Sequence, residues 1–159
     1  PWQSQAYYKY YQATGAREAA DFVFTMNDFM VETFAEDETK DVASPRYCLA
    51  DTSCPLCESF DTDAGIVMAV YVEGMNKAYM LAEELGDEAR KKCYGEFIRQ
   101  GSEAVIELQF PLEEQNASDF SGAAFGGFFG SERDLTMQVD RNQHAVMALM
   151  GAYELGLVE

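Results

Sequence analysis

The sequence contains one histidine, and its surroundings are suited to general acid or base chemistry. His144 follows Asp140 by four positions, so on a helix the two side chains share a face. An imidazole oriented by a carboxylate exchanges protons near neutral pH, as a hydrolase, an epimerase or a lyase requires. The alternative is a buried histidine that forms hydrogen bonds inside a helical array.

Glu73 is the second candidate, because it interrupts an apolar run that begins at Ile66. An unpaired buried carboxylate is costly, so Glu73 must have a partner or face a cavity. It could act as an acid or bind a sugar hydroxyl, and it could equally be a structural partner for a neighbouring segment. We predict a catalytic set of His144, Asp140 and Glu73, with no metal ion and no cofactor.

Five further residues could bind a substrate. Asp61 and Asp63 could supply a second carboxylate, although Asp61 could instead cap a helix. Arg133 and Arg141 could clamp a uronate or another carboxylate, or they could neutralise nearby acidic residues. Phe128 could stack on a sugar ring, or it could pack over the core as part of a loop.

Three Ala-Tyr pairs indicate the elements that position these residues. They occur at Ala6-Tyr7, Ala78-Tyr79 and Ala152-Tyr153, about 72 and 74 positions apart by subtraction. Each pair lies near the end of an apolar helical run, and a glycine that can end a helix follows. A more polar, amphipathic helix comes after the first two glycines. The repeating unit is therefore an inner apolar helix and an outer amphipathic helix.

The pattern predicts an all-α fold of repeated helical hairpins, forming one domain over residues 1–159 or part of a larger one. The expected elements are a hairpin at 1–34, a long loop at 35–65, a hairpin at 66–110, a long loop at 111–136 and a final inner helix at 137–156. The glycine turns and the long loops fall at opposite ends of the hairpins, so both long loops share one rim. Inner-helix N-termini also reach this rim, where their unpaired N–H groups favour anionic ligands.

The spacing and several short motifs resemble the (α/α) toroids of the six-hairpin glycosidases and the N-acylglucosamine 2-epimerases. These motifs are Phe60-Asp61-Thr62, Tyr71-Val72-Glu73-Gly74, Leu85-Gly86-Asp87, and Gly126-Gly127-Phe128 running into Val139-Asp140-Arg141-Asn142-Gln143-His144-Ala145. In those families inner helices ring a central cavity, and the loops at one rim build a carbohydrate site. The resemblance implies a partial toroid that acts on or binds a sugar or oligosaccharide, as a glycoside hydrolase, a sugar epimerase or a polysaccharide lyase.

A noncatalytic, acidic helical-repeat scaffold or subunit that binds another protein is the second interpretation. The array starts inside a helix and its third unit lacks an outer helix. We therefore expect a fragment of a longer array, with additional hairpins or a partner chain covering the repeat ends. Convergence of the candidate residues would favour an enzyme, whereas scattered and mutually paired residues would favour a scaffold.

The charge balance restricts the possible partners. With 28 acidic and 11 basic residues the formal charge is -17, which argues against nucleic acids and anionic membrane surfaces. It could serve solubility or life in a salty medium, or it could attract a basic partner or a cation. No apolar run approaches the roughly 20 residues that span a bilayer, so no membrane partner is expected.

The cysteines bear on the cellular compartment. Cys48, Cys54 and Cys57 crowd the first long loop, and Cys93 lies on a predicted helix. A disulfide within the loop would imply an extracellular or periplasmic protein. Free thiols are the alternative, and zinc is disfavoured because only one CxxC pair is present and His144 is distant in sequence.

Overall fold

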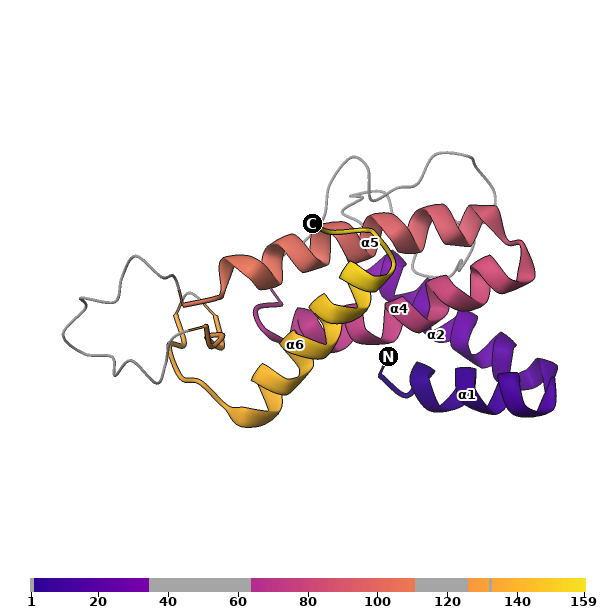
Figure 1. Cartoon of the computed structure of the whole chain (residues 1–159), viewed down its shortest axis with the longest axis horizontal. Coiled ribbons are helices and arrows are strands. Elements are labelled where there is room, and N and C mark those ends of the chain that lie inside the picture. Colours follow the sequence, from indigo (N-terminus) through magenta and orange to yellow (C-terminus); the bar gives the residue numbers. More distant parts are fainter. Residues whose placement is uncertain (1, 35–63, 111–125, 132) are drawn as a thin grey trace.

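The chain is described by a computed structural model over residues 2–34, 64–110, 126–131 and 133–159. Within these ranges the helices are α1 (Ser4–Thr14), α2 (Arg17–Phe34), α4 (Val67–Leu85), α5 (Glu88–Glu107) and α6 (Val139–Glu154) (Figure 1). This part of the chain has no strand beyond two isolated β-bridges. The predicted all-α class is therefore confirmed for the described residues.

Glycines end two of the helices, as the sequence predicted. Gly15 follows α1 with φ 69°, and its N–H donates to the carbonyl of Tyr11 at 2.7 Å. Gly86 follows α4 with φ 70°. A residue with a side chain rarely adopts this left-handed conformation, so glycine is the favoured residue at both turns. Each turn brings the next helix, α2 or α5, back alongside the one before it.

Helix α4 lies at the centre of the fold. It contacts α1, α2, α5 and α6 (Figure 1). Its large apolar side chains Met68, Val72, Met75 and Leu81 are completely buried. This agrees with a sequence that is apolar on nearly all faces of this helix, since its exposed residues are confined to its two ends.

Helices α1, α4 and α6 run in the same direction. Tyr8 of α1 donates through its hydroxyl to Glu84 of α4 at 3.3 Å, across 76 positions of the chain. The side-chain amide of Asn76 in α4 donates to the carbonyl of Ala148 in α6 at 3.0 Å, across 72 positions. The Ala-Tyr pairs of the same helices lie 72 and 74 positions apart by subtraction.

Residues next to the two long loops meet at one end of the helices. The N–H of Ile66, just before α4, donates to the carbonyl of Gly130 at 2.9 Å. Asn142 in the first turns of α6 accepts from the Phe128 N–H at 2.7 Å and donates to the Phe128 carbonyl at 3.1 Å. The segment 126–131 thereby ties together the starts of α4 and α6.

A membrane-spanning helix is not found among the described residues, since none of their helices combines sufficient length with sufficient apolar character.

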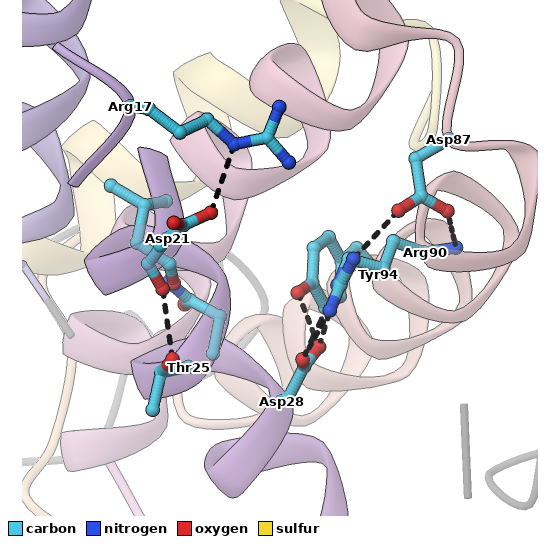
Figure 2. Close-up of polar contacts among 9 residues, drawn as sticks. Arg17, Asp21, Thr25, Asp28, Asp87, Arg90 and Tyr94 are labelled. Atoms are coloured by element: carbon cyan, nitrogen blue, oxygen red, sulfur yellow. Dashed lines mark hydrogen bonds and ion pairs between the residues drawn. The ribbon is translucent and has the colours of Figure 1, made fainter. Parts of the chain in front are cut away.

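A buried ion pair joins α2 to α5. Arg90 Nη2 lies 2.9 Å from Asp28 Oδ2, and the Tyr94 hydroxyl donates to Asp28 Oδ1 at 2.5 Å (Figure 2). Asp87, which caps the start of α5, contacts Arg90 Nη1 at 2.7 Å. Burial alone lowers the pKa of Arg90, but the bonds from Asp28 and Asp87 outweigh burial and raise it, so the guanidinium stays charged.

Replacing Asp28 by Ala should destabilise the protein by about 3 kcal/mol or more, because it leaves a partly buried guanidinium without its main partner. Asp21→Ala is the matched control on the same helix. Its partner Arg17 is 72% exposed and Asp21 is 58% exposed, so stability should stay close to wild type. Urea unfolding measures the free energy of unfolding of both variants. Equal losses in the two variants would contradict this prediction, because the buried ion pair would then stabilise the protein no more than the exposed one.

Tyr8 gives the α1–α4 contact a pH dependence. Burial, and then the neighbouring Glu84 carboxylate, raise the pKa of the Tyr8 phenol above its usual range. A raised pKa stabilises the fold below the unfolded value of about 10, and this stabilisation is lost as the pH rises through the folded value. The stability advantage of wild type over Tyr8→Phe should therefore shrink as the pH is raised above 10 in urea-unfolding series. A constant difference would contradict this.

Candidate functional site

Glu73 lies on the central helix α4, and its side chain meets residues from two other helices. It is only 7% exposed. One carboxylate oxygen, Oε2, lies 2.6 Å from Nδ1 of His144 in α6. The other, Oε1, accepts a hydrogen bond from the side-chain amide of Gln5 in α1. The predicted need of Glu73 for a partner is thus met by two, and three helices converge on one carboxylate.

His144 is oriented by this contact while it keeps access to solvent. Its side chain is 27% exposed. A neutral imidazole that donates from Nδ1 to Glu73 carries its lone pair on Nε2. Among the described residues, no hydrogen-bond partner lies at Nε2. The pair therefore has the arrangement in which a carboxylate fixes the tautomer of a histidine and leaves the other nitrogen available for proton transfer.

Asn76 sets how closely α6 approaches α4 beside this pair. It follows Glu73 by three positions on the same face of α4, is 2% exposed, and donates to the carbonyl of Ala148. A side chain at Gly151 would place its Cβ 2.3 Å from Asn76 Nδ2, so only glycine allows this approach. Asn76, like Glu73, interrupts an otherwise apolar run of the sequence. The pattern that indicated Glu73 could therefore have indicated Asn76 as well.

Asp140 does not contact the imidazole in the way its spacing suggested. It is exposed in the first turn of α6, where the positive helix N-terminus favours a carboxylate. The carboxylate that contacts His144 comes from α4 instead, across 71 positions of the chain. The i, i+4 spacing brings Asp140 and His144 to one side of α6, but the imidazole turns toward Glu73.

Three of the five predicted substrate-binding residues, Arg141, Arg133 and Phe128, lie in the described part of the chain. Arg141 forms an ion pair with Asp134 at 3.1 Å, as its neutralising alternative predicted. Bonds from Thr136, and then from Arg141, hold the pKa of Asp134 below its usual range. Arg133 is exposed. Phe128 is 3% exposed and belongs to the hydrophobic core, so its ring is not presented for stacking on a sugar.

Other predicted positions cannot be placed. Asp61 and Asp63 lie outside the described residues, as do the three loop cysteines Cys48, Cys54 and Cys57. Within the described ranges, no group of three His, Cys, Asp or Glu side chains is arranged to hold a metal ion.

A surface hollow of about 320 Å³ lies against α5 and the end of α4, and its lining includes Tyr79, Lys91, Arg99 and Leu157. Neither Glu73 nor His144 contributes to it. Two of its cations are already engaged, since Lys91 pairs with Glu83 and Arg99 pairs with two glutamates of α5. The Glu73–His144 pair is therefore the stronger candidate site.

Because His144 is the only histidine in the chain, its tautomer can be followed without ambiguity. We expect ¹⁵N chemical shifts of the neutral ring to report a proton on Nδ1. Glu73→Ala removes the acceptor and should move the proton toward Nε2, whereas Asp140→Ala should leave the spectrum unchanged. A response to Asp140→Ala alone would show that the wrong carboxylate has been identified.

Searches against models of protein families, curated proteins and solved structures found no match for the chain. The resemblance to the toroidal enzymes therefore rests on the sequence motifs alone. What the site does must be inferred from its own geometry.

Proposed function

We propose that the chain is a carbohydrate-active domain of the (α/α) toroid type, acting on a sugar or oligosaccharide by acid/base chemistry. One observation supports this most: Glu73 and His144, far apart in sequence, meet at 2.6 Å through Nδ1. A histidine held in this way is a common proton-transfer group in enzymes. The sugar substrate is suggested by the motif resemblance.

In this proposal His144 is the catalytic residue and Glu73 is a positioning residue. Nε2 would take a proton from a sugar carbon in an epimerase or a lyase, or give one to the leaving oxygen in a hydrolase. Glu73 would hold the ring and stabilise its charged form. Asp140, one turn earlier on α6 and exposed, is a second group that could contact the substrate.

The surrounding arrangement supports the assignment in a second way. Glu73 is held by Gln5 from α1 as well as by His144 from α6. A carboxylate fixed from two sides does not need to reorganise when the imidazole gains a proton, and such preorganisation is what favours catalysis. Asn76 and Gly151 add to it by fixing the distance between α4 and α6.

The test is turnover of a panel of neutral, N-acetylated and uronate oligosaccharides, followed by NMR so that hydrolysis, elimination and epimerisation are all detected. His144→Gln should lower the rate at least 100-fold on the substrate that reacts. Glu73→Gln should lower kcat more than it raises KM, because it disturbs the ring and not the substrate. Gln143→Ala, exposed on the neighbouring position, is the control and should react as wild type does.

Two results would contradict the proposal. One is a panel in which no member binds or reacts. The other is turnover that His144→Gln leaves unchanged. The noncatalytic alternative, a module that binds another protein, has a separate observation in its favour, the apolar outer side of α6.

A further inference from the structure

Helix α6 exposes a row of apolar side chains on the side opposite its buried alanines. The outer face of α6 carries the exposed apolar residues Val139, Val146, Met147, Met150 and Tyr153, with the exposed amide of Gln143 among them. Val139 is 87% exposed, Tyr153 68% and Met150 55%. Helical spacing puts these residues in one stripe, and such a stripe on a surface marks an interaction site more often than chance.

The spacing of the Ala-Tyr pairs relates each position on the outer face of α6 to a position on α4. The Ala-Tyr pairs of α4 and α6 lie about 74 positions apart. Subtracting this offset places Met147 at the position of Glu73 and Met150 at the position of Asn76. Those two residues of α4 form side-chain hydrogen bonds with α6. The outer face of α6 is therefore the counterpart of a surface that, on α4, is covered by a parallel helix.

The side of α6 that covers α4 shows what kind of helix fits. It is built from small residues: Ala145, Ala148 and Ala152 are completely buried, and Gly151 lies against Asn76. Small side chains allow two helix backbones to approach closely. A helix that covered the outer face of α6 in the same way would present alanine or glycine to it. The flexible side chains of Met147 and Met150 would fill the gaps between such residues.

The negative charge of this chain indicates which residues should lie beside the small side chains of the partner helix. The two carboxylates of α6, Asp140 and Glu154, are both exposed. The whole chain carries a formal charge of -17, so a second copy would be repelled at low salt. A partner with lysine or arginine on either side of its small residues would be attracted instead.

We propose that the outer face of α6 binds an α-helix of a partner protein, parallel to α6, with a stripe of alanine or glycine flanked by lysine or arginine. This surface lies on the side of α6 away from α4. It does not depend on whether His144 transfers protons, so this inference and the proposed carbohydrate chemistry can fail independently.

Three stapled helical peptides test the chemistry. The first carries alanine at i, i+3 and i+7, as Ala145, Ala148 and Ala152 do in α6, with lysine on both flanks. The second replaces the alanines with leucine, and the third replaces the lysines with glutamate. Calorimetric titration of the whole chain should show the first peptide binding at least about tenfold more tightly than either of the others.

Protein variants test the location. Met150→Glu, or Val146→Glu as a second variant, should weaken binding of the first peptide at least about tenfold, since each places a charge in an apolar contact. Ile106→Glu is the matched control, because Ile106 is an exposed apolar residue on α5. It should bind as wild type does. Circular dichroism checks that each variant is folded, which is expected because all three positions are exposed.

Several results would overturn the proposal. Equal binding of the alanine and leucine peptides would remove the need for small residues, and equal binding of the glutamate peptide would remove the charge argument. Binding unaffected by either α6 variant would place the contact elsewhere. Sedimentation velocity decides the remaining case: self-association abolished by Met150→Glu would make a second copy the occupant, and absence of peptide binding would reject a helical partner.

Discussion

The enclosure of α4 by four other helices is the constraint on which the rest of the structure depends. A helix in this position has apolar side chains on nearly every face, and burial of a charged group on it is costly unless that group has a partner within the protein. Glu73 and Asn76 are the two buried polar side chains of α4, and both turn to α6. Glu73 also receives Gln5 from α1. The cost of burying one carboxylate is thus offset by contacts that hold two neighbouring helices in register, and the same contacts create the candidate site.

The sequence predicted the helices and the two central residues of the site, but not the way they pair. Apolar periodicity and glycines such as Gly15 and Gly86 are local signals, so they indicate where helices lie and where they end. Glu73 was recognisable because a charge in an apolar run needs a partner. Its partnership with His144 depends on the rotation and height of α6 against α4, which no local pattern encodes. For the same reason spacing within one helix suggested Asp140, and nothing in the sequence pointed to Gln5.

Few positive charges are available in this acidic chain, and the structure uses several of them in defined pairs. Arg90 lies between Asp28 and Asp87, and also sits 4.4 Å from the centre of the Phe24 ring. Arg99 pairs with Glu96 and lowers the pKa of that carboxyl, so the pair stays charged to a lower pH than an unpaired glutamate would. Cations used in this way neutralise nearby acids and leave the outer surface negative. A strongly negative surface lowers the chance of self-association and raises the rate at which a basic partner is met.

The candidate site and the outer face of α6 share one helix, which links them physically. Helix α6 packs on α4 mainly through alanines, and small side chains bury less apolar area than leucine or phenylalanine would. A close approach of two backbones is therefore obtained with a modest hydrophobic contribution. The position of His144 against Glu73 depends on that approach, because the imidazole comes from α6 and the carboxylate from α4. Covering the outer face would bury larger side chains, Met150 and Tyr153 among them, and would hold α6 in place more firmly than its inner face does alone. A partner on the outer face would then stabilise the geometry of the pair without contacting either residue.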